Sequence, residues 1–179
     1  MKQILIIVDM QNDFIDGALG TKEAVAIVDN VIAEIAKYDT KDIFATRDTH
    51  PENYLETQEG KNLPVPHCIR GTDGWQIRKE LDVLRKTEPI DKETFGSVAL
   101  AARLVSMNEE EEIEGITFVG LCTDICVISN ALLAKAFLPE AEIVVDAACC
   151  AGVTPESHRT ALRAMKACQI TVEHEGEAD

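Results

Sequence analysis

Short runs of branched aliphatic residues recur along the 179-residue chain at the length of single β-strands. Such near-continuous apolar runs are typical of strands buried on both faces of a sheet, as in parallel sheets covered by helices. The strongest runs lie at residues 4–8, 43–46, 116–121, 143–145 and 170–172, and a weaker one lies near 88–90. A chain divided in this way is predicted to build one central sheet.

Helical patterns separate these runs. Apolar residues recur close to the helical period of 3.6 in the segments 23–38, 98–107, 124–137 and 155–167. Thr154 is a candidate N-cap for the last segment, with Pro155 at its first helical position. Strands that alternate with helices predict an α/β fold, with a doubly wound, mostly parallel sheet and helices on both faces. The length predicts a single domain over residues 1–179.

The charge balance narrows the set of partners. Seventeen Lys and Arg residues stand against 32 Asp and Glu residues, which gives a net charge of −15. Such a surface repels nucleic acids and anionic membranes, so we expect small molecules, metal cations or further copies of the chain as partners. No apolar stretch reaches the roughly 18 residues that a membrane helix needs. The six cysteines are expected to be reduced thiols in a cytoplasmic protein.

Reactive side chains follow several of the predicted strands. In an open parallel sheet, ligands bind beyond the carboxyl ends of the strands, so residues at those ends meet in space. Directly after the runs come a carboxylate, an Asp/His pair, a lysine and two thiols, namely Asp9, Asp48 with His50, Lys92, and Cys122 with Cys126. This combination at one edge of a sheet indicates an enzyme.

Each of these residues also has a structural interpretation. Cys126 falls in the first turn of the helix predicted from residue 124, where free N–H groups favour a thiolate, but most cysteines are simply small buried residues. Asp9 is a candidate catalytic base or a cap for the turn that follows it. Cys149, Cys150 and Cys168 are interpreted as core residues. His158 and His174 are interpreted as structural or exposed.

The segment around Asp48 predicts a metal site. In an extended chain, Asp48 and His50 point to the same side, and a carboxylate beside an imidazole suits Zn²⁺, Fe²⁺ or Mn²⁺. His67 is the natural third ligand, at the far end of a Pro- and Gly-rich loop over residues 49–75. Glu59 is a candidate fourth ligand, either directly or through water. Aperiodic loops of that length are usually functional.

The motifs together resemble a known family, the isochorismatase-like cysteine hydrolases. The likeness spans nearly the whole chain and is most specific in the Gly-x-x-Thr-Asp-x-Cys-Val segment. It is carried by the segments Asp9-Met10-Gln11-Asn12-Asp13-Phe14, Asp48-Thr49-His50-Pro51, His67-Cys68-Ile69-Arg70-Gly71-Thr72 and Gly120-Leu121-Cys122-Thr123-Asp124-Ile125-Cys126-Val127, together with Lys92. Within the superfamily, Asp-x-His followed by a second His before Cys-x-x-Gly-Thr is most similar to the nicotinamidases, whereas isochorismatases lack the nucleophilic cysteine.

The resemblance implies the roles of individual residues. It implies an Asp9–Lys92–Cys126 catalytic triad, an oxyanion hole from the backbone N–H groups of Cys122 and Cys126, and a cis peptide before Cys122. It implies a divalent metal held by Asp48, His50 and His67, and a substrate ring flanked by Phe14. The implied reaction is the deamidation of nicotinamide through a thioester, in an enzyme that usually forms homo-oligomers.

One position departs from the pattern of many nicotinamidases, because Thr49 stands where they have a tryptophan. Aromatic residues make up only 4% of the chain, and Tyr54 and Phe95 are the remaining candidates for stacking on the ring. A cysteine amidohydrolase acting on an N-carbamoyl or ureido compound is therefore the main alternative. Two more distant ones are a receiver-like signalling domain and a thiol redox sensor built on Cys122 and Cys126.

Overall fold

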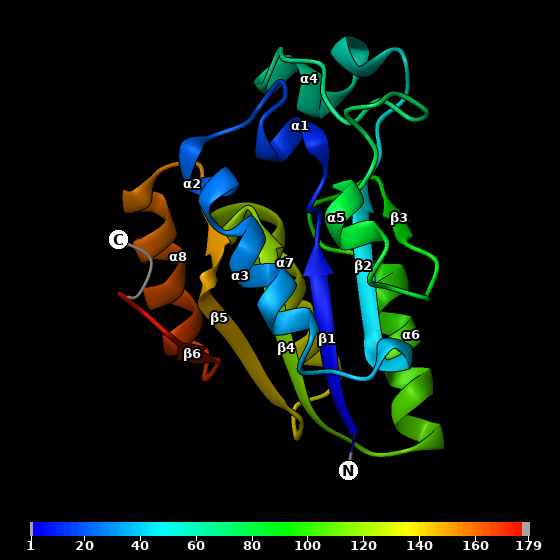
Figure 1. Cartoon of the computed structure of the whole chain (residues 1–179), viewed down its shortest axis with the longest axis vertical. Coiled ribbons are helices and arrows are strands. Elements are labelled where there is room, and N and C mark those ends of the chain that lie inside the picture. Colours follow the sequence, from blue (N-terminus) through cyan, green and yellow to red (C-terminus); the bar gives the residue numbers. More distant parts are fainter. Residues whose placement is uncertain (1, 177–179) are drawn as a thin grey trace.

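The computed structural model in Figure 1 describes residues 2–176. Within that range the strands form one parallel sheet in the order β3-β2-β1-β4-β5-β6. The strands are β1 (Lys2–Val8), β2 (Ile43–Asp48), β3 (Ile90–Lys92), β4 (Ile113–Leu121), β5 (Glu142–Ala151) and β6 (Thr171–Glu173). The predicted α/β class and the parallel sheet are confirmed.

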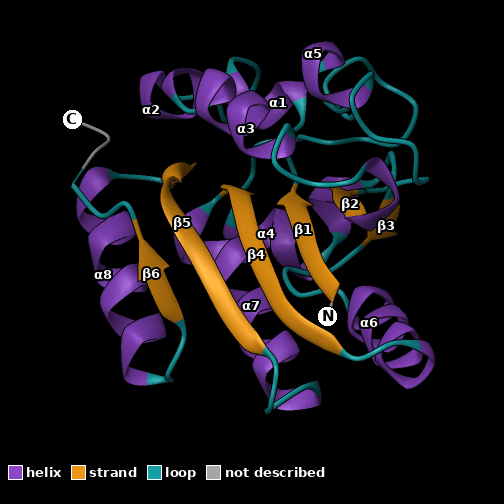
Figure 2. Cartoon of the chain, turned by 60° about the horizontal axis from the view of Figure 1, so that its bottom comes forward, coloured by secondary structure: helices purple, strands orange, loops and turns teal. Residues whose placement is uncertain are grey.

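The two faces of the sheet follow from the period of two along each strand. In β1, Ile4, Ile6 and Val8 pack against α6 (Val98–Glu110), α7 (Ile128–Phe137) and α8 (Pro155–Ala167). The alternate residues Leu5 and Ile7 pack on the opposite face, which is covered by α1 (Asn12–Ile15), α2 (Lys22–Ala26), α3 (Val28–Ile35) and α5 (Lys79–Asp82). Figure 2 shows the sheet between these two helical layers.

Several predicted boundaries were wrong. The pattern over residues 23–38 is two helices, α2 and α3, which meet at Ile27. The run at 143–145 is part of the ten-residue strand β5, whose second half is rich in Ala and Cys and carries little strand propensity. It is paired with β4 through a register shift between Phe118 and Gly120. Tertiary pairing therefore extends a strand that local propensity does not reveal.

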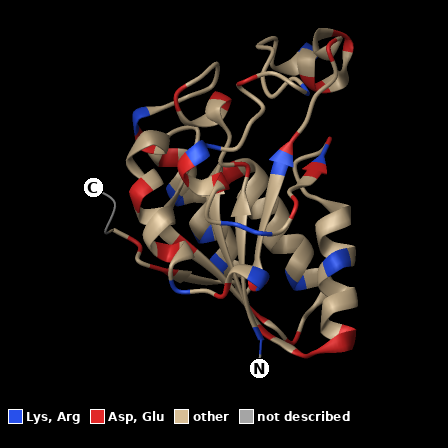
Figure 3. Ribbon diagram, turned by 45° about the vertical axis from the view of Figure 1, so that its right-hand side comes forward, with Lys and Arg blue, Asp and Glu red and all other residues tan. Residues whose placement is uncertain are grey.

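The C-terminal helix agrees with its prediction. Thr154 caps α8 in a reciprocal capping box with Ser157, and Pro155 is the first helical residue. The acidic run at 109–112 lies at the exposed end of α6 (Figure 3). Among residues 2–176, none of the helices combines the length and the hydropathy that a membrane-spanning helix requires.

The order of the strands creates a crevice above the sheet. The chain leaves β1 toward β2 on one side, and β4 lies on the other, so the connections diverge at the carboxyl ends of these two central strands. The long loop after β2 contains the short turn η2 (Tyr54–Glu56) and the helix α4 (Gln58–Asn62). This loop lies above the carboxyl end of the sheet (Figure 1).

Candidate active site

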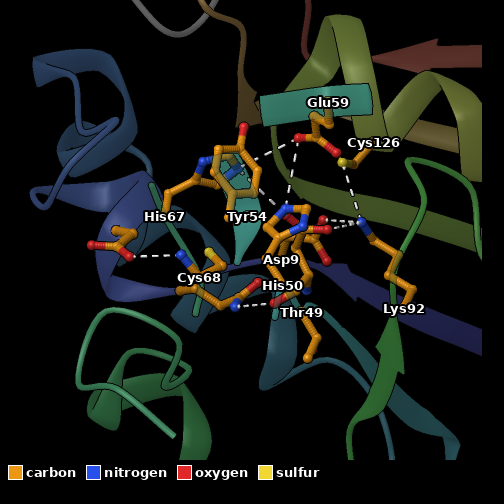
Figure 4. A network of polar contacts seen from close by, with 12 residues as sticks. Asp9, Thr49, His50, Tyr54, Glu59, His67, Cys68, Lys92 and Cys126 are labelled. Atoms are coloured by element: carbon orange, nitrogen blue, oxygen red, sulfur yellow. Dashed lines mark hydrogen bonds and ion pairs between the residues drawn. The ribbon is translucent and has the colours of Figure 1, made fainter. Parts of the chain in front are cut away.

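A lysine joins the side chains predicted at the ends of three strands. The Lys92 ammonium lies 2.6 Å from Asp9 Oδ2, 3.3 Å from Cys126 Sγ and 3.3 Å from Asp48 Oδ1. All of these side chains are buried, and Thr46 donates a hydrogen bond of 2.7 Å to the other oxygen of Asp9. Figure 4 shows the lysine reaching toward the sulfur of Cys126 from β3. The structure thus brings together the three residues of the predicted triad.

Local backbone geometry brings Asp9 and Cys126 to this point. Asp9 has a φ of +47°, in the left-handed region that Asp tolerates better than most residues. Gly120 has a φ of +117°, and a Cβ there would lie 2.2 Å from the Val8 carbonyl, so only glycine fits. The Leu121–Cys122 peptide is cis, as the resemblance implies. Cys126 lies in a π-helical turn, η3 (Thr123–Val127), rather than in the first turn of an α-helix.

Burial dominates the electrostatics of the cluster. It raises the pKa of the Cys126 thiol well above its ordinary value, and the carboxylate of Asp9 raises it further. The expectation that the helix start favours a resting thiolate was therefore wrong. Burial also raises the pKa of Asp9 despite the opposing charge of Lys92. For Lys92, burial alone would lower the pKa, but Asp9, Cys126 and Asp48 together raise it, so the lysine stays charged.

The predicted metal ligands also converge. Asp48 Oδ2 lies 2.9 Å from His50 Nε2 and 3.7 Å from His67 Nε2, and Glu59 Oε1 lies 3.6 Å from each of these two nitrogens. His67 Nδ1 contacts the Val65 carbonyl at 2.8 Å, which favours a proton on Nδ1 and leaves the Nε2 lone pair facing the cluster. Glu59 is thus placed where the sequence predicted a fourth ligand.

Sequence reasoning missed the residues that position Asp48. The buried amide of Gln11 donates to the Asp48 carbonyl at 2.8 Å and accepts from the Asp48 N–H at 2.7 Å. It also donates to the Trp75 carbonyl at 2.9 Å. The Trp75 indole in turn donates to the Thr49 hydroxyl at 2.9 Å. Gln11 lies inside the Asp9–Phe14 motif, which was its one signal in the sequence.

A pocket of about 1070 Å³ opens above these groups. Cys122, Cys126, Asp48, His50 and His67 line it, together with mostly apolar side chains that include Phe14 and Phe95. The interpretation of Tyr54 as a ring-stacking residue was wrong. Tyr54 is fully buried, packs edge-on against both histidines at centroid distances of 4.8 and 5.1 Å, and donates to the Leu63 carbonyl.

A family model described as the isochorismatase domain matches residues 3–175. The chain belongs to the isochorismatase family. The nicotinamidase of Schizosaccharomyces pombe is 26% identical to it, over 94% of this chain and 91% of that protein. The nicotinamidase/pyrazinamidase of Mycobacterium tuberculosis is also 26% identical, over 93% and 95% of the two chains. As a member of this family, the chain is a hydrolase.

Solved structures from the isochorismatase family agree with this fold. The pyrazinamidase of Pyrococcus horikoshii in complex with zinc superposes with a TM-score of 0.78 and 28% identity, over 96% of this chain and 98% of that one. The nicotinamidase/pyrazinamidase of Bacillus subtilis gives a TM-score of 0.79 and 27% identity, over 96% and 99%. The doubly wound arrangement predicted from the sequence is the arrangement of these proteins.

The remaining cysteines and histidines lie elsewhere. Cys149 and Cys150 are buried as predicted. The interpretation of Cys168 as a core residue was wrong, because it lies just after the last turn of α8 and is exposed. His158 contacts the Thr123 hydroxyl at 2.7 Å. His174 contacts Asp146 at 3.1 Å. All six cysteines carry free thiols, Cys122 and Cys126 included.

Proposed function

We propose that this hydrolase converts nicotinamide to nicotinate and ammonia through a thioester at Cys126, in a metal-dependent reaction. The observation that carries the proposal is that Cys126 faces the same pocket as Asp48, His50 and His67 while it contacts the buried Lys92–Asp9 pair. The chain is a hydrolase that acts on carbon–nitrogen amide bonds, and relatives named nicotinamidase support nicotinamide as the amide.

Acylation begins with a proton transfer inside the buried cluster. Asp9 takes the proton from the Cys126 thiol, and its raised pKa makes it a stronger base than an exposed carboxylate. The sulfur attacks the carboxamide carbon, and the carbon–nitrogen bond breaks. Asp9 returns the proton to the leaving nitrogen, so that ammonia departs and a Cys126 thioester remains. Lys92 stays charged throughout and stabilises the anionic forms of both Asp9 and Cys126.

Deacylation reverses the roles. Asp9 accepts a proton from water, and the resulting hydroxide adds to the thioester carbon. The carbon–sulfur bond then breaks, and Asp9 gives the proton to the sulfur, so that Cys126 leaves as a thiol. In both steps the developing oxyanion is proposed to be held by the backbone N–H groups of Cys122 and Cys126, two residues that line the pocket. Phe14, whose ring lies 5.4 Å from that of His67, is proposed to flank the substrate ring.

The chemistry of the donor set fits a divalent metal. A carboxylate and two imidazole nitrogens converge within 4.8 Å of one another, all on buried residues, which suits Zn²⁺, Fe²⁺ or Mn²⁺. When bound, the ion would supply a Lewis-acidic point that orients a ring nitrogen. Asp48, His50 and His67 would hold it, with Glu59 reaching the same point directly or through water. Asp48 meanwhile keeps its other oxygen on Lys92.

Another amide of the N-carbamoyl or ureido type is the second candidate. The favouring observation is that Thr49 lines the pocket where many nicotinamidases place a tryptophan, and Trp75 lies behind it instead. Ammonia release measured across nicotinamide, pyrazinamide and ureido compounds distinguishes the two. The highest kcat/KM on a ureido compound would replace nicotinamide in this proposal.

Substitution of the nucleophile tests the chemistry itself. Cys126→Ala should reduce deamidation to background while metal content stays as in the unaltered protein, whereas Cys168→Ala, at an exposed thiol, should retain activity. Activity in Cys126→Ala would refute the thioester.

The metal ligands are tested separately. Asp48→Ala and His50→Ala should lose bound metal and raise KM. Full metal content and unchanged KM in both ligand variants would refute the metal assignment.

Domain extent, assembly and compartment complete the proposal. We propose one cysteine hydrolase domain over residues 1–179, which the family match over 3–175 supports. Six free thiols support a reducing compartment, the cytoplasm. A homo-oligomer is proposed from the family resemblance, and light scattering on the purified protein tests it.

A further inference from the structure

A buried amide outside the pocket joins two segments of the candidate site. Asn130 lies on α7, about one helical turn after Cys126, and only 2% of it is exposed. It is not one of the residues that line the pocket, and the proposed reaction uses none of its atoms. A polar side chain buried in this way takes its hydrogen-bond partners from the protein, so those partners indicate its role.

Both polar atoms of this amide have partners. Its Nδ2 donates to the Cys126 carbonyl at 2.8 Å and to the Phe95 carbonyl at 3.2 Å. Its Oδ1 accepts from the Ser97 N–H at 2.8 Å. Since an amide side chain has two donor hydrogens and one oxygen, the two hydrogens and the oxygen are all used. The bond to Cys126 stays within the helical segment, whereas the other two cross to the segment that follows β3.

The segment that receives these two bonds leads directly from Lys92. β3 is a three-residue strand at the edge of the sheet, and its pairing with β2 ends at Lys92. Residues 93–97 then run to α6 close to α7, where a Cβ on Gly96 would lie 2.6 Å from Leu133 Cδ1. Within residues 2–176, the hydrogen bonds that join 93–97 to the helical segment of Cys126 all come from Asn130. This amide therefore docks the chain after Lys92 onto that segment.

The docking matters because the Lys92 ammonium contacts two parts of the fold. On the side of the sheet it pairs with Asp9 and Asp48, and on the other side it lies 3.3 Å from Cys126 Sγ (Figure 4). The two carboxylates hold the ammonium from the sheet, so the position of η3 sets its distance to the sulfur. Charges interact strongly in a buried site, and a small change in this distance therefore alters the stability of the Cys126 anion.

We propose that Asn130 is a positioning residue that sets the contact between Lys92 and Cys126. Its amide ties the turn of Cys126 to the segment that leaves Lys92, so that the ammonium and the sulfur are held at contact distance. The inference rests on the proposed role of Cys126 as the nucleophile. Asn130 acts through the backbone of these two segments and touches neither the substrate pocket nor the reacting atoms.

Two measurements on Asn130→Ala test this role. Its kcat for deamidation should fall by about 100-fold, since a misplacement of about 1 Å costs about that factor, while KM changes far less. Alkylation of Cys126 by iodoacetamide, followed by peptide mass spectrometry, should slow by about tenfold or more, because the sulfur anion loses the nearby ammonium. A merely structural role predicts the opposite sign for alkylation, because loosened packing exposes a thiol that is buried in the unaltered protein.

Asn108→Ala is the matched control. Asn108 lies on α6 and accepts from the Ile113 N–H at 2.8 Å, at the opposite end of the sheet. Its loss should lower the free energy of unfolding and leave kcat and the alkylation rate of Cys126 unchanged. Asn130→Ser separates the bonds of Asn130, because a serine hydroxyl can donate to the carbonyl four residues earlier but is too short to cross to the segment 93–97. This variant should resemble Asn130→Ala.

Three outcomes would overturn the proposal. They are an unchanged kcat in Asn130→Ala, faster alkylation of Cys126 in that variant, and unaltered values of both quantities in Asn130→Ser. If Asn130→Ala does not fold, as judged by circular dichroism, Asn130→Ser decides the question. Alkylation needs no substrate, so it tests Asn130 separately from the proposed function. If the unaltered protein does not deamidate nicotinamide but the Asn130 variants are alkylated more slowly, only the proposed amide is refuted.

Discussion

Asp48 is the residue that connects the two parts of the candidate site. One of its oxygens contacts the Lys92 ammonium and the other faces both histidines. Burial would raise its pKa, but the hydrogen bond from His50 and the charge of Lys92 lower it below the ordinary value. The carboxylate therefore stays ionised, as a metal ligand must. Gln11 bonds both the N–H and the carbonyl of the Asp48 backbone, so the orientation of Asp48 depends on a residue that lies between β1 and α1.

Replacing Gln11 with methionine tests this dependence. Gln11→Met keeps the side-chain length but removes three hydrogen bonds, two of them to the Asp48 backbone. Residues that orient a metal ligand typically contribute 10–100-fold to affinity, so zinc binding in the pocket should weaken by about that factor. Isothermal titration of zinc into the apo protein measures it.

Asn12→Ala is the control for that measurement. The neighbouring amide of Asn12 donates only to the Asp73 carbonyl in an exposed position, and its loss should leave zinc affinity unchanged. Equal affinities for Gln11→Met and the unaltered protein would show that the β2 backbone holds Asp48 without help.

At the scale of elements, the sequence predicts those helices and strands whose boundaries are set by residues adjacent in the chain. The period of apolar residues and the Thr154–Pro155 start were enough to place α8. The π-helical turn around Cys126 depends instead on its packing beside β4 and α8, and no local pattern announced it. Similarly, the start of β3 at Ile90 is fixed by pairing with Thr46 of β2 rather than by its own residues. Elements built by tertiary pairing therefore had the poorest boundaries.

The capping box of α8 carries the prediction at this scale. Thr154→Ala removes the acceptor for the Ser157 N–H and should lower the free energy of unfolding by about 1 kcal/mol. Thr160→Ala makes the same chemical change at an exposed position inside the same helix, where alanine has the higher helix propensity, and should not destabilise the protein. Urea denaturation of both variants measures the difference. Equal destabilisation would show that the cap contributes nothing specific.

For the whole molecule, the candidate site lies where the chain connections diverge, at the carboxyl ends of the neighbouring strands β1 and β4. The strands on one side of that point, β1 to β3, supply Asp9, Asp48 and Lys92, whereas the chain after β4 supplies Cys126. The sequence predicted this convergence because strand ends in a parallel sheet meet at one edge. It could not predict the contacts made by Tyr54 and Trp75, which come from the aperiodic loop over residues 49–75 and are set only once that loop folds over the sheet.

In this arrangement we expect the bound metal to restrain the conformation of the loop. His50 and His67 flank the segment 51–66, and Tyr54 packs against both rings, so an ion held by both histidines would fix the two ends of the segment next to β2. Removing an ion that bridges the two ends of a loop restores the conformational freedom of the chain between them. Chelation should therefore accelerate backbone hydrogen exchange within residues 51–66 and leave the amides of β1 and β4 protected, as measured by mass spectrometry.

The double variant His50→Ala/His67→Ala isolates the cause of that change. Its segment 51–66 should exchange quickly from the start and should not respond to the chelator, because the ion has no ligands left at the ends of the loop. Acceleration spread evenly over the sheet would instead mean that the metal stabilises the fold as a whole. No acceleration in the unaltered protein would mean that the hydrogen bond from Tyr54 to the Leu63 carbonyl and the packing of α4 hold the loop without the ion.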